Sequence, residues 1–282
     1  MSEKWWIILL LLLQSVVATA QESGKVKSRI ISLSPNLTEI LFEIGAGEQI
    51  VGTVEYSNYP QAASQIPRVG RYDRLDLESI VSLMPDLIVA WESGNAPAEL
   101  GRLRSLGFEV VVTEPQQLEA VAEVMEQLGR RIGVAGEARR RATAYRQRLQ
   151  QIRERYRKSR PVRLFYEVWN QPLMTVNGKQ IISNVVELCG GVNVFGALSS
   201  LSPRVSVEAA LEQDPEAIIA SGMGSARPEW LDSWRDYPML QAVQQDNLYH
   251  VPPDIIQRHG PRLVVGAERV CEALQTARQK RL

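Results

Sequence analysis

Cysteine and histidine are scarce in this chain. The 282 residues contain two cysteines, Cys189 and Cys271, and two histidines, His250 and His259, and these do not cluster at the spacing of metal ligands. The sequence also lacks a Gly-rich phosphate loop and a nucleophile placed beside a suitable base. We therefore expect no metal site, no catalytic residue and no enzymatic activity.

The chain carries no net charge and no long apolar run. Its 32 basic and 32 acidic side chains balance, so nothing global indicates a nucleic acid as partner. The apolar run at 5–13 follows Lys4 and is shorter than the roughly 20 residues that a membrane-spanning helix needs. Small residues at 18–20 suit a signal peptidase, and no cysteine follows that could carry a lipid. We expect residues 1–20 to be a cleaved signal peptide rather than a membrane anchor, and the product to be periplasmic.

Export to the periplasm determines the expected oxidation state of the two cysteines. In an oxidising compartment the default for Cys189 and Cys271 is a disulfide between them, with two buried thiols as the alternative. A loop of about 80 residues closed in this way would stabilise the fold by roughly 4 to 5 kcal/mol in the chain-entropy model.

One stretch of the sequence occurs twice. LDLESIVSLMPDLIVA at 75–90 is answered by VSVEAALEQDPEAIIA at 205–220, with Glu78 and Glu208 at the same point of the two copies. A second pair, LTEILFEIGAGEQIVG and ISNVVELCGGVNVFG, is typical of a helix that ends on a left-handed glycine and leads into a strand. The repeat indicates two halves of similar structure.

Strand-like segments flank these copies at 29–34, 108–115, 162–168 and 247–254. Strands that alternate with helices predict an α/β fold with largely parallel sheets. We expect two such lobes with a ligand cleft between them, because open α/β sheets bind ligands at the carboxyl ends of their strands.

The segment 134–159 between the halves contains helix formers throughout and no proline. A helix of about 25 residues extends for nearly 40 Å, so it predicts a rigid connector rather than a flexible linker. Side chains at helical spacing can pack on both lobes: Ala142, Tyr145, Leu149, Ile152 and Tyr156. We expect an N-terminal lobe at 26–133, a backbone helix at 134–159 and a C-terminal lobe at 160–282.

The same segment is strongly basic. Attraction to an anionic membrane surface is one interpretation. We favour the other, a solvated outer face of the helix.

Aromatic side chains follow several of the predicted strands: Tyr56, Tyr59, Tyr72, Trp91 and Trp169. A cleft walled by rings suits a large, flat, partly apolar ligand. Core packing is the alternative for any single ring, but five rings at strand ends favour a site.

Several segments resemble a known family: SLSPNLTEILFEIGAG, YSNYP, LDLESIVSLMPDLIVAW and VVELCGGVNVF. They are similar to the helical-backbone (class III) substrate-binding proteins of ABC importers, and most of all to the cobalamin-binding members. The resemblance runs from about residue 29 to about residue 275. It implies a periplasmic monomer without a cofactor of its own, which captures cobalamin or a related corrinoid and delivers it to the permease subunits of an importer. Both cysteines fall where that family has its disulfide.

The resemblance also implies site residues. By position, the corrin-facing aromatic residues of the first lobe correspond to Tyr56, Tyr72 and Trp91, with Tyr72 in the place of a tryptophan. Asp254 and Arg258 match polar residues that contact the amide side chains of the corrin.

The second lobe departs from the family pattern. Ser202 stands where a relative has a tryptophan, and Leu173 and Met174 occupy a loop that carries a phenylalanine. We expect Trp169 to replace the lost rings.

Because the second lobe departs from the family pattern, ligands other than a corrinoid are alternatives. Haem is the first alternative, since haem receptors of the superfamily use a tyrosine one residue before the place of Tyr72 as an iron ligand. A ferric siderophore is the next, with cationic groups from Arg71, Arg74, Arg204 and Arg258. An enzyme that acts on a tetrapyrrole-like ligand is the third.

The repeated glutamates have two interpretations. Asp76 and Ser206 are placed as N-caps, so Glu78 and Glu208 would stabilise the first turn of a helix through its dipole. The resemblance implies a sharper role, in which one glutamate on each lobe pairs with arginines of the permease. We expect Glu78 and Glu208 to be this docking pair.

Overall fold

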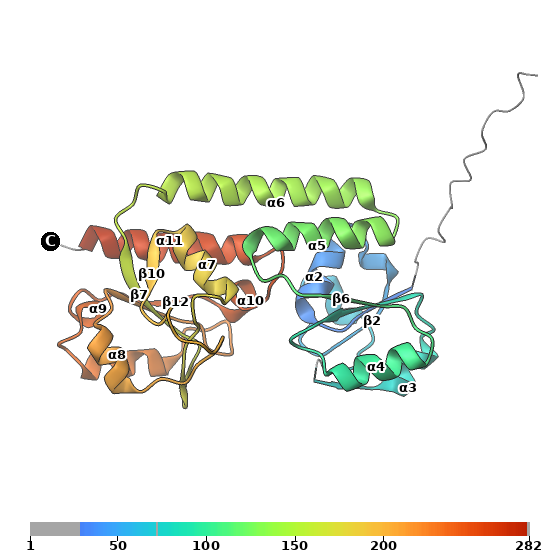
Figure 1. Ribbon diagram of the computed structural model, residues 1–282, viewed down its shortest axis with the longest axis horizontal. Coiled ribbons are helices and arrows are strands. Elements are labelled where there is room, and N and C mark those ends of the chain that lie inside the picture. The colour runs from blue at the N-terminus through green and yellow to red at the C-terminus, as the bar shows by residue number, and fades with distance from the viewer. Residues whose placement is uncertain (1–28, 72, 281–282) are drawn as a thin grey trace, which may run out of the picture.

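The computed structural model describes residues 29–71 and 73–280. The predicted signal peptide and Tyr72 lie outside the described residues. Two α/β lobes follow one another along the long axis of the molecule, and helix α6 (Ala135–Tyr156) runs over both of them (Figure 1). The predicted two-lobed α/β fold is therefore confirmed. Among residues 29–71 and 73–280, no helix combines the length and the apolar character needed to cross a membrane.

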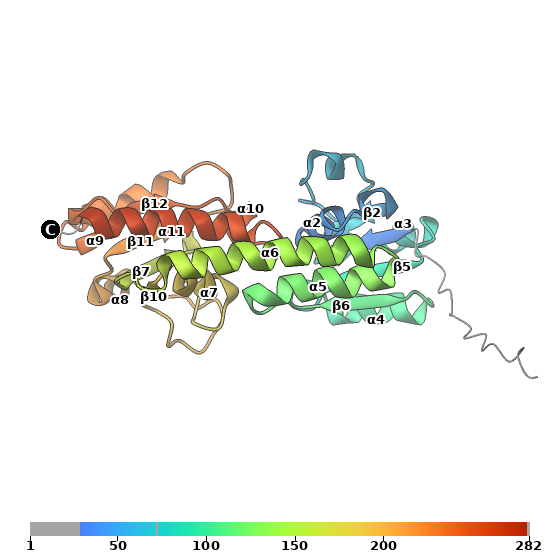
Figure 2. The ribbon, with the colours of Figure 1, turned by 90° about the horizontal axis from the view of Figure 1, so that it is seen from above.

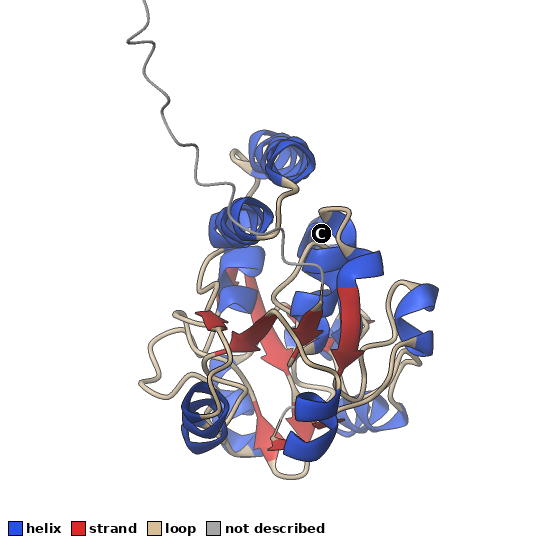
Figure 3. Cartoon of the chain, turned by 90° about the vertical axis from the view of Figure 1, so that its right-hand side faces the viewer, coloured by secondary structure: helices blue, strands red, loops and turns tan. Residues whose placement is uncertain are grey.

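The first lobe is built on a parallel sheet whose strand order is β2-β1-β5-β6. Its strands are β1 (Ile30–Ser32), β2 (Ile50–Thr53), β5 (Leu87–Trp91) and β6 (Val110–Thr113). The central strands are apolar and buried because helices cover both faces of the sheet (Figure 3). The other elements are α2 (Pro35–Glu43), η1 (Gly47–Gln49), η2 (Gln61–Gln65), β3 (Gly70–Arg71), β4 (Arg74–Leu75), α3 (Leu77–Ser82), α4 (Pro97–Ser105) and α5 (Leu118–Arg131).

The second lobe repeats this plan with the strand order β10-β7-β11-β12, again parallel. Its strands are β7 (Val162–Glu167), β10 (Gly191–Asn193), β11 (Ala217–Ala220) and β12 (Leu248–His250). Each sequence repeat takes the same place in both sheets, so the predicted internal repeat is confirmed. The other elements are β8 (Trp169–Asn170), β9 (Leu173–Met174), α7 (Ile181–Leu188), α8 (Val207–Gln213), η3 (Glu229–Asp236), α9 (Gln241–Gln244), α10 (Pro253–Ile256) and α11 (Leu263–Lys280).

Local signals in the sequence set most helix ends. Gly45 and Gly190 follow α2 and α7 with φ angles of +81° and +68°, the left-handed conformation that glycine adopts without strain. The predicted N-caps before α3 and α8 are confirmed, since each side chain accepts a hydrogen bond from a backbone N–H three residues on. Ser34 precedes α2 at the N-cap position, but its hydroxyl donates to Asn36 Oδ1 instead of capping the helix.

Helix α6 holds the lobes at a fixed separation. Its 22 residues extend for about 33 Å. It packs on α5 of the first lobe and α11 of the second, which lie along it in both views (Figures 1 and 2). One hydrophobic core joins the two lobes: it includes Ile30 of the first lobe, the buried side chains of α6 and Ala277 of the second lobe. Of the side chains expected to pack, Tyr156 is only partly buried and the others are buried: Ala142, Tyr145, Leu149 and Ile152.

The basic face of α6 is largely paired. Three of its arginines bind glutamates of the helices beneath, at distances of 2.6 to 2.7 Å: Arg146 with Glu126, Arg153 with Glu119 and Arg148 with Glu268. Ion pairs to both lobes support a structural role for these charges over attraction to a membrane.

Cys189, which follows α7, forms a disulfide with Cys271 of α11, with an S–S distance of 2.04 Å. The predicted disulfide is confirmed, and the alternative of two buried thiols is wrong. Among the residues that the structure describes, no group of three or more His, Cys, Asp or Glu side chains is placed to hold a metal ion.

Candidate functional site

A cavity of about 520 Å³ lies between the lobes, where the loops that follow β5, β6, β7 and β12 meet. The first lobe contributes Trp91, Ser93, Glu114 and Gln116. The polar residues from the second lobe are Lys179, Gln180, Ser202, Gln257 and His259. The apolar ones are Val168, Val176, Ile181, Ile182 and Leu201. This mixture of apolar surface and a few polar groups at the carboxyl ends of strands is typical of a site for an organic ligand.

Trp91 is held in the cavity wall by the turn that follows β5. Its backbone N–H donates to Asn95 Oδ1 at 2.8 Å, and Asn95 Nδ2 donates to the carbonyl of Leu33 at 3.0 Å. Gly94 leaves room for the ring, since a Cβ at this position would lie 2.1 Å from it. The indole Nε1 is buried and has no hydrogen-bond partner among the described residues. The ring therefore offers an apolar surface to a ligand, while its N–H lies on the buried side.

His259 lies against Trp91, with the two rings edge to face and their centroids 5.7 Å apart. Burial lowers the pKa of His259 to about 4, so the imidazole is neutral at pH 7. Gln180 Nε2 and His259 Nε2 are 3.4 Å apart. Nothing in the sequence around His259 predicts its burial or its contact with Trp91.

Of the other predicted rings, the three that the structure describes, Tyr56, Tyr59 and Trp169, do not line the cavity. Tyr56 is 61% exposed on the loop after β2 and has a φ angle of +66°, which is uncommon for a residue other than glycine. Trp169 is half-buried on β8, where its indole N–H donates to the carbonyl of Gln171. Its ring lies edge to face with Trp230, with the ring centroids 6.3 Å apart. The sequence did not predict this contact with Trp230 of η3, because Trp230 lies outside the repeated segments. Tyr59 stacks under the guanidinium of Arg262 at 4.0 Å.

Asp254 and Arg258 are engaged with each other and with the first lobe. Arg258 pairs with Asp254 at 2.8 Å and with Glu39 at 2.9 Å, and it donates to Asn58 Oδ1 at 2.9 Å. Neither residue lines the cavity. The contact of both residues with a ligand stays a prediction, while the contact of Arg258 with Glu39 and Asn58 of the first lobe was not expected from the sequence.

The second wall of the cavity is apolar rather than aromatic. Ser202 and Leu201 line it, as do Val168 and Val176. Leu173 is buried in the core of the second lobe, and Met174 pairs with Trp169 across the β8–β9 hairpin. Trp169 is not among the residues that line the cavity, and its replacement of the lost rings stays a prediction.

Glu78 and Glu208 are exposed in the first turns of α3 and α8. Figure 1 shows these two helices on the side of the molecule opposite α6, one on each lobe. Hydrogen bonds from its own backbone N–H and from the Ser206 hydroxyl lower the pKa of Glu208, which keeps the carboxylate charged. The arrangement presents one acid per lobe on a common side.

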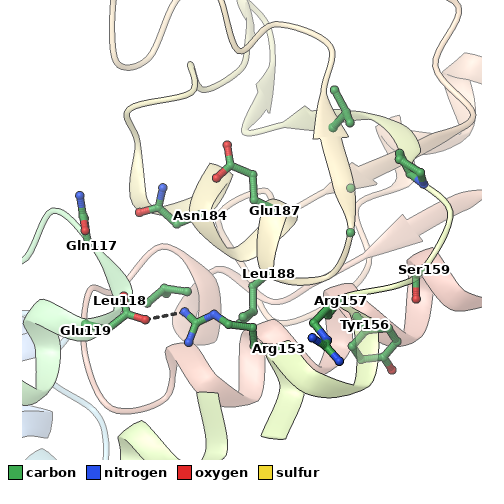
Figure 4. Close-up of a pocket in the computed structure, with 14 residues that line it drawn as sticks. Gln117, Leu118, Glu119, Arg153, Tyr156, Arg157, Ser159, Asn184, Glu187 and Leu188 are labelled. Carbon is green, nitrogen blue, oxygen red and sulfur yellow. Dashed lines mark hydrogen bonds and ion pairs between the residues drawn. The ribbon is translucent and has the colours of Figure 1, made fainter. Parts of the chain in front are cut away.

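A second cavity of about 590 Å³ is lined by the start of α5, the end of α6 and α7 (Figure 4). The ion pair between Arg153 and Glu119 lies in its wall at 2.6 Å. Its strand residues, Gly191 and Val192, lie at the start of β10 rather than at a carboxyl end. We therefore place the candidate site in the first cavity.

Two α/β lobes on a rigid helix, with a cavity at the carboxyl ends of both sheets, define a two-lobed ligand-binding protein. The chain belongs to the periplasmic binding protein family, whose model matches residues 30–255. The members to which it is similar are binding proteins and not enzymes, and the family is periplasmic by its description.

Three comparisons indicate its place within the family. The vitamin B12-binding protein of Vibrio cholerae is 36% identical over 252 residues, which cover 89% of this chain and 91% of the relative. The crystal structure of the periplasmic vitamin B12-binding protein BtuF of Vibrio cholerae matches with a TM-score of 0.83 at 35% identity, covering 90% of this chain and 99% of that one. The periplasmic haem-binding protein RhuT of Roseiflexus has a TM-score of 0.79 at 20% identity, covering 89% and 99% of the two chains, and this likeness shows the fold alone.

Proposed function

We propose that this protein captures cobalamin or a related corrinoid in the periplasm and delivers it to the permease subunits of an ABC importer. The observation that carries the proposal is the 36% identity, over 89% of the chain, to a vitamin B12-binding protein. The haem-binding proteins of similar structure are 18 to 24% identical, so they support the architecture and not the ligand.

The chemistry of the cavity suits a corrinoid. The indole of Trp91 and the apolar side chains of Val168 and Leu201 can cover the face of a corrin ring. The side-chain amides of Gln180 and Gln257 can donate to and accept from the amide groups at the edge of the ring. Apolar contacts supply affinity here, while the amides orient the ligand.

A titration of the purified mature chain tests this proposal. Cyanocobalamin, haemin and a ferric siderophore are added in parallel, and binding is followed by calorimetry and by absorbance. We expect a one-to-one complex with cyanocobalamin at micromolar protein, from which the ligand is recovered unchanged, as a binding protein and not an enzyme requires. Absence of cyanocobalamin binding together with binding of haemin or the siderophore would reassign the cargo.

We further infer that the exported protein is a monomer cleaved after Ala20, with cobalamin as its cargo and no resident cofactor. The small residues at 18–20 support the cleavage site. The intact mass of the secreted protein tests the cleavage, and light scattering tests the monomer.

A further inference from the structure

Lys179 carries the only ammonium or guanidinium group among the described residues that line the interlobe cavity. The neutral His259 adds no charge at pH 7. Arg258 and Arg262, which do not line the cavity, are engaged by Glu39. No ion pair involves Lys179 among the described residues, and the side chain is exposed to solvent. A single unpaired positive charge therefore faces the space that the ligand would fill.

The backbone around Lys179 is fixed. Its N–H donates to Asn177 Oδ1 at 3.0 Å, and Gln180 caps α7 by accepting a hydrogen bond from the Ile182 N–H at 2.6 Å. Gln180, Ile181 and Ile182 also line the cavity, so the first turn of α7 forms part of its wall. The backbone N–H groups of Lys179, Gln180 and Ile182 are bound within the protein, so the ammonium group of Lys179 is the donor left for a ligand.

The acid of the opposite wall does not neutralise this charge. Glu114 accepts hydrogen bonds from the backbone N–H and the hydroxyl of Ser93, at 2.9 and 3.1 Å, within its own lobe. The cavity therefore has a positive second-lobe side and a hydrogen-bonded acid on the first-lobe side. This polarity favours a ligand with one anionic group placed toward α7.

We propose that Lys179, just before α7, forms an anion subsite, and that its occupant is the phosphodiester of the nucleotide loop of a complete cobamide. The proposal rests on the proposed function. The corrin side chains are neutral amides, so the phosphodiester is the anionic group by which such a ligand can be recognised. Lys179 is then a specificity residue that distinguishes cobalamin from cobinamide, which lacks the phosphodiester.

The test compares two ligands and four proteins. Dissociation constants for cyanocobalamin and dicyanocobinamide are measured by calorimetry, at low and high salt, for the wild type, Lys179→Gln, Lys179→Arg and Lys158→Gln. We expect Lys179→Gln to weaken cyanocobalamin binding by about five- to twentyfold at low salt and to leave cobinamide binding unchanged. Lys179→Arg keeps the charge and should retain the preference. Lys158→Gln removes the same charge from an exposed position outside the cavity and should match the wild type.

Each failure has its own signature. If the wild type binds neither corrinoid, the proposed function is wrong. If it binds both, and Lys179→Gln changes neither affinity or weakens both equally, the anion subsite is wrong. A haemin titration distinguishes the other source of an anion, because haemin binding that depends on Lys179 would assign the subsite to a carboxylate. Thermal unfolding without ligand verifies that each variant is folded.

Discussion

The carboxylate of Glu39 in the first lobe accepts two hydrogen bonds from the guanidinium of Arg262 in the second, at 2.9 and 2.6 Å. Arg258 of the second lobe binds the same carboxylate at 2.9 Å. Glu39 is only 3% exposed, so this cluster is buried where α2 meets the start of α11. It forms a tie between the lobes in addition to α6, and it limits their relative movement.

Substitution of Glu39 should destabilise the protein strongly. Glu39→Gln removes the anion that compensates Arg258 and Arg262, and we expect the free energy of unfolding to fall by about 3 kcal/mol. Glu43→Gln on the same helix is the control, because Glu43 pairs with Arg141 at 3.5 Å on the surface and should cost less than about 1 kcal/mol. Urea unfolding at pH 7 measures both. Equal effects would show that the buried cluster does not stabilise the fold.

Removal of the Trp91 ring should weaken cobalamin binding. Trp91→Ala deletes the aromatic surface in the cavity wall, and we expect a loss of roughly ten- to a hundredfold in affinity. Trp91→Phe should retain part of the affinity. Trp169→Ala is the comparison, since that ring packs on Trp230 and does not line the cavity, and it should matter less. Calorimetry would contradict this view if Trp169→Ala caused the larger loss.

Glu167 should make stability depend on pH. Its side chain accepts a hydrogen bond from Trp234 Nε1 at 2.8 Å, and burial raises its pKa to about 8 from an ordinary value near 4.5. Between these two pH values the folded state holds a proton that the unfolded state has lost, so this group makes stability fall as pH rises. The slope is at most about 1.4 kcal/mol per pH unit.

The variant Glu167→Gln isolates this effect. Gln cannot ionise but can still accept a hydrogen bond from Trp234. The free energy of unfolding of the wild type should therefore fall relative to that of the variant from about pH 4.5 to pH 8, and the difference should stay constant above pH 8. His259, whose pKa is lowered to about 4, contributes a slope of opposite sign below pH 6.5 in both proteins and cancels in the difference. The free energy of unfolding of both proteins is measured at several pH values. If the difference between them stayed constant from pH 4.5 to pH 8, the raised pKa of Glu167 would be contradicted.

The docking pair makes a prediction about uptake. Glu78→Ala combined with Glu208→Ala should abolish or strongly weaken corrinoid uptake in cells, because charge-assisted pairs with a permease would be lost. The affinity for cyanocobalamin in solution should stay within about twofold, since neither residue lines the cavity.

A matched double variant controls for the loss of two charges. Glu123→Ala combined with Glu272→Ala removes one exposed acid per lobe from α5 and α11, the helices beneath α6, and should leave uptake intact. Unimpaired uptake in the Glu78 and Glu208 variant would leave helix stabilisation as their role, and a fall in affinity would make them site residues.

Much of the architecture could be predicted from the sequence because its signals are local. The paired motifs around Glu78 and Glu208 predicted two similar lobes, and the unbroken run of helix formers predicted α6 to within a few residues of Ala135–Tyr156. Apolar periodicity, caps and terminal glycines act within a turn of the chain, so they can be read without a partner.

The candidate site could be predicted only in part. Trp91 was expected and lines the cavity, whereas the roles of Tyr56, Trp169, Asp254 and Arg258 in ligand binding stay predictions. A position at the end of a strand brings a residue to the right edge of a sheet. It does not determine whether a ring faces the cavity, which depends on what else packs there.

The sequence by itself determined the two lobes, the rigid connector, the disulfide and the exposed pair of glutamates, because each follows from local pattern or from resemblance along the chain. Only the tertiary structure decided that Glu39 binds Arg258 and Arg262, that His259 is buried against Trp91, and that Lys179 faces the ligand space. The reason is physical. These contacts join residues that are distant in the sequence, and burial or pairing at such a contact is a property of the folded surroundings and not of the residue.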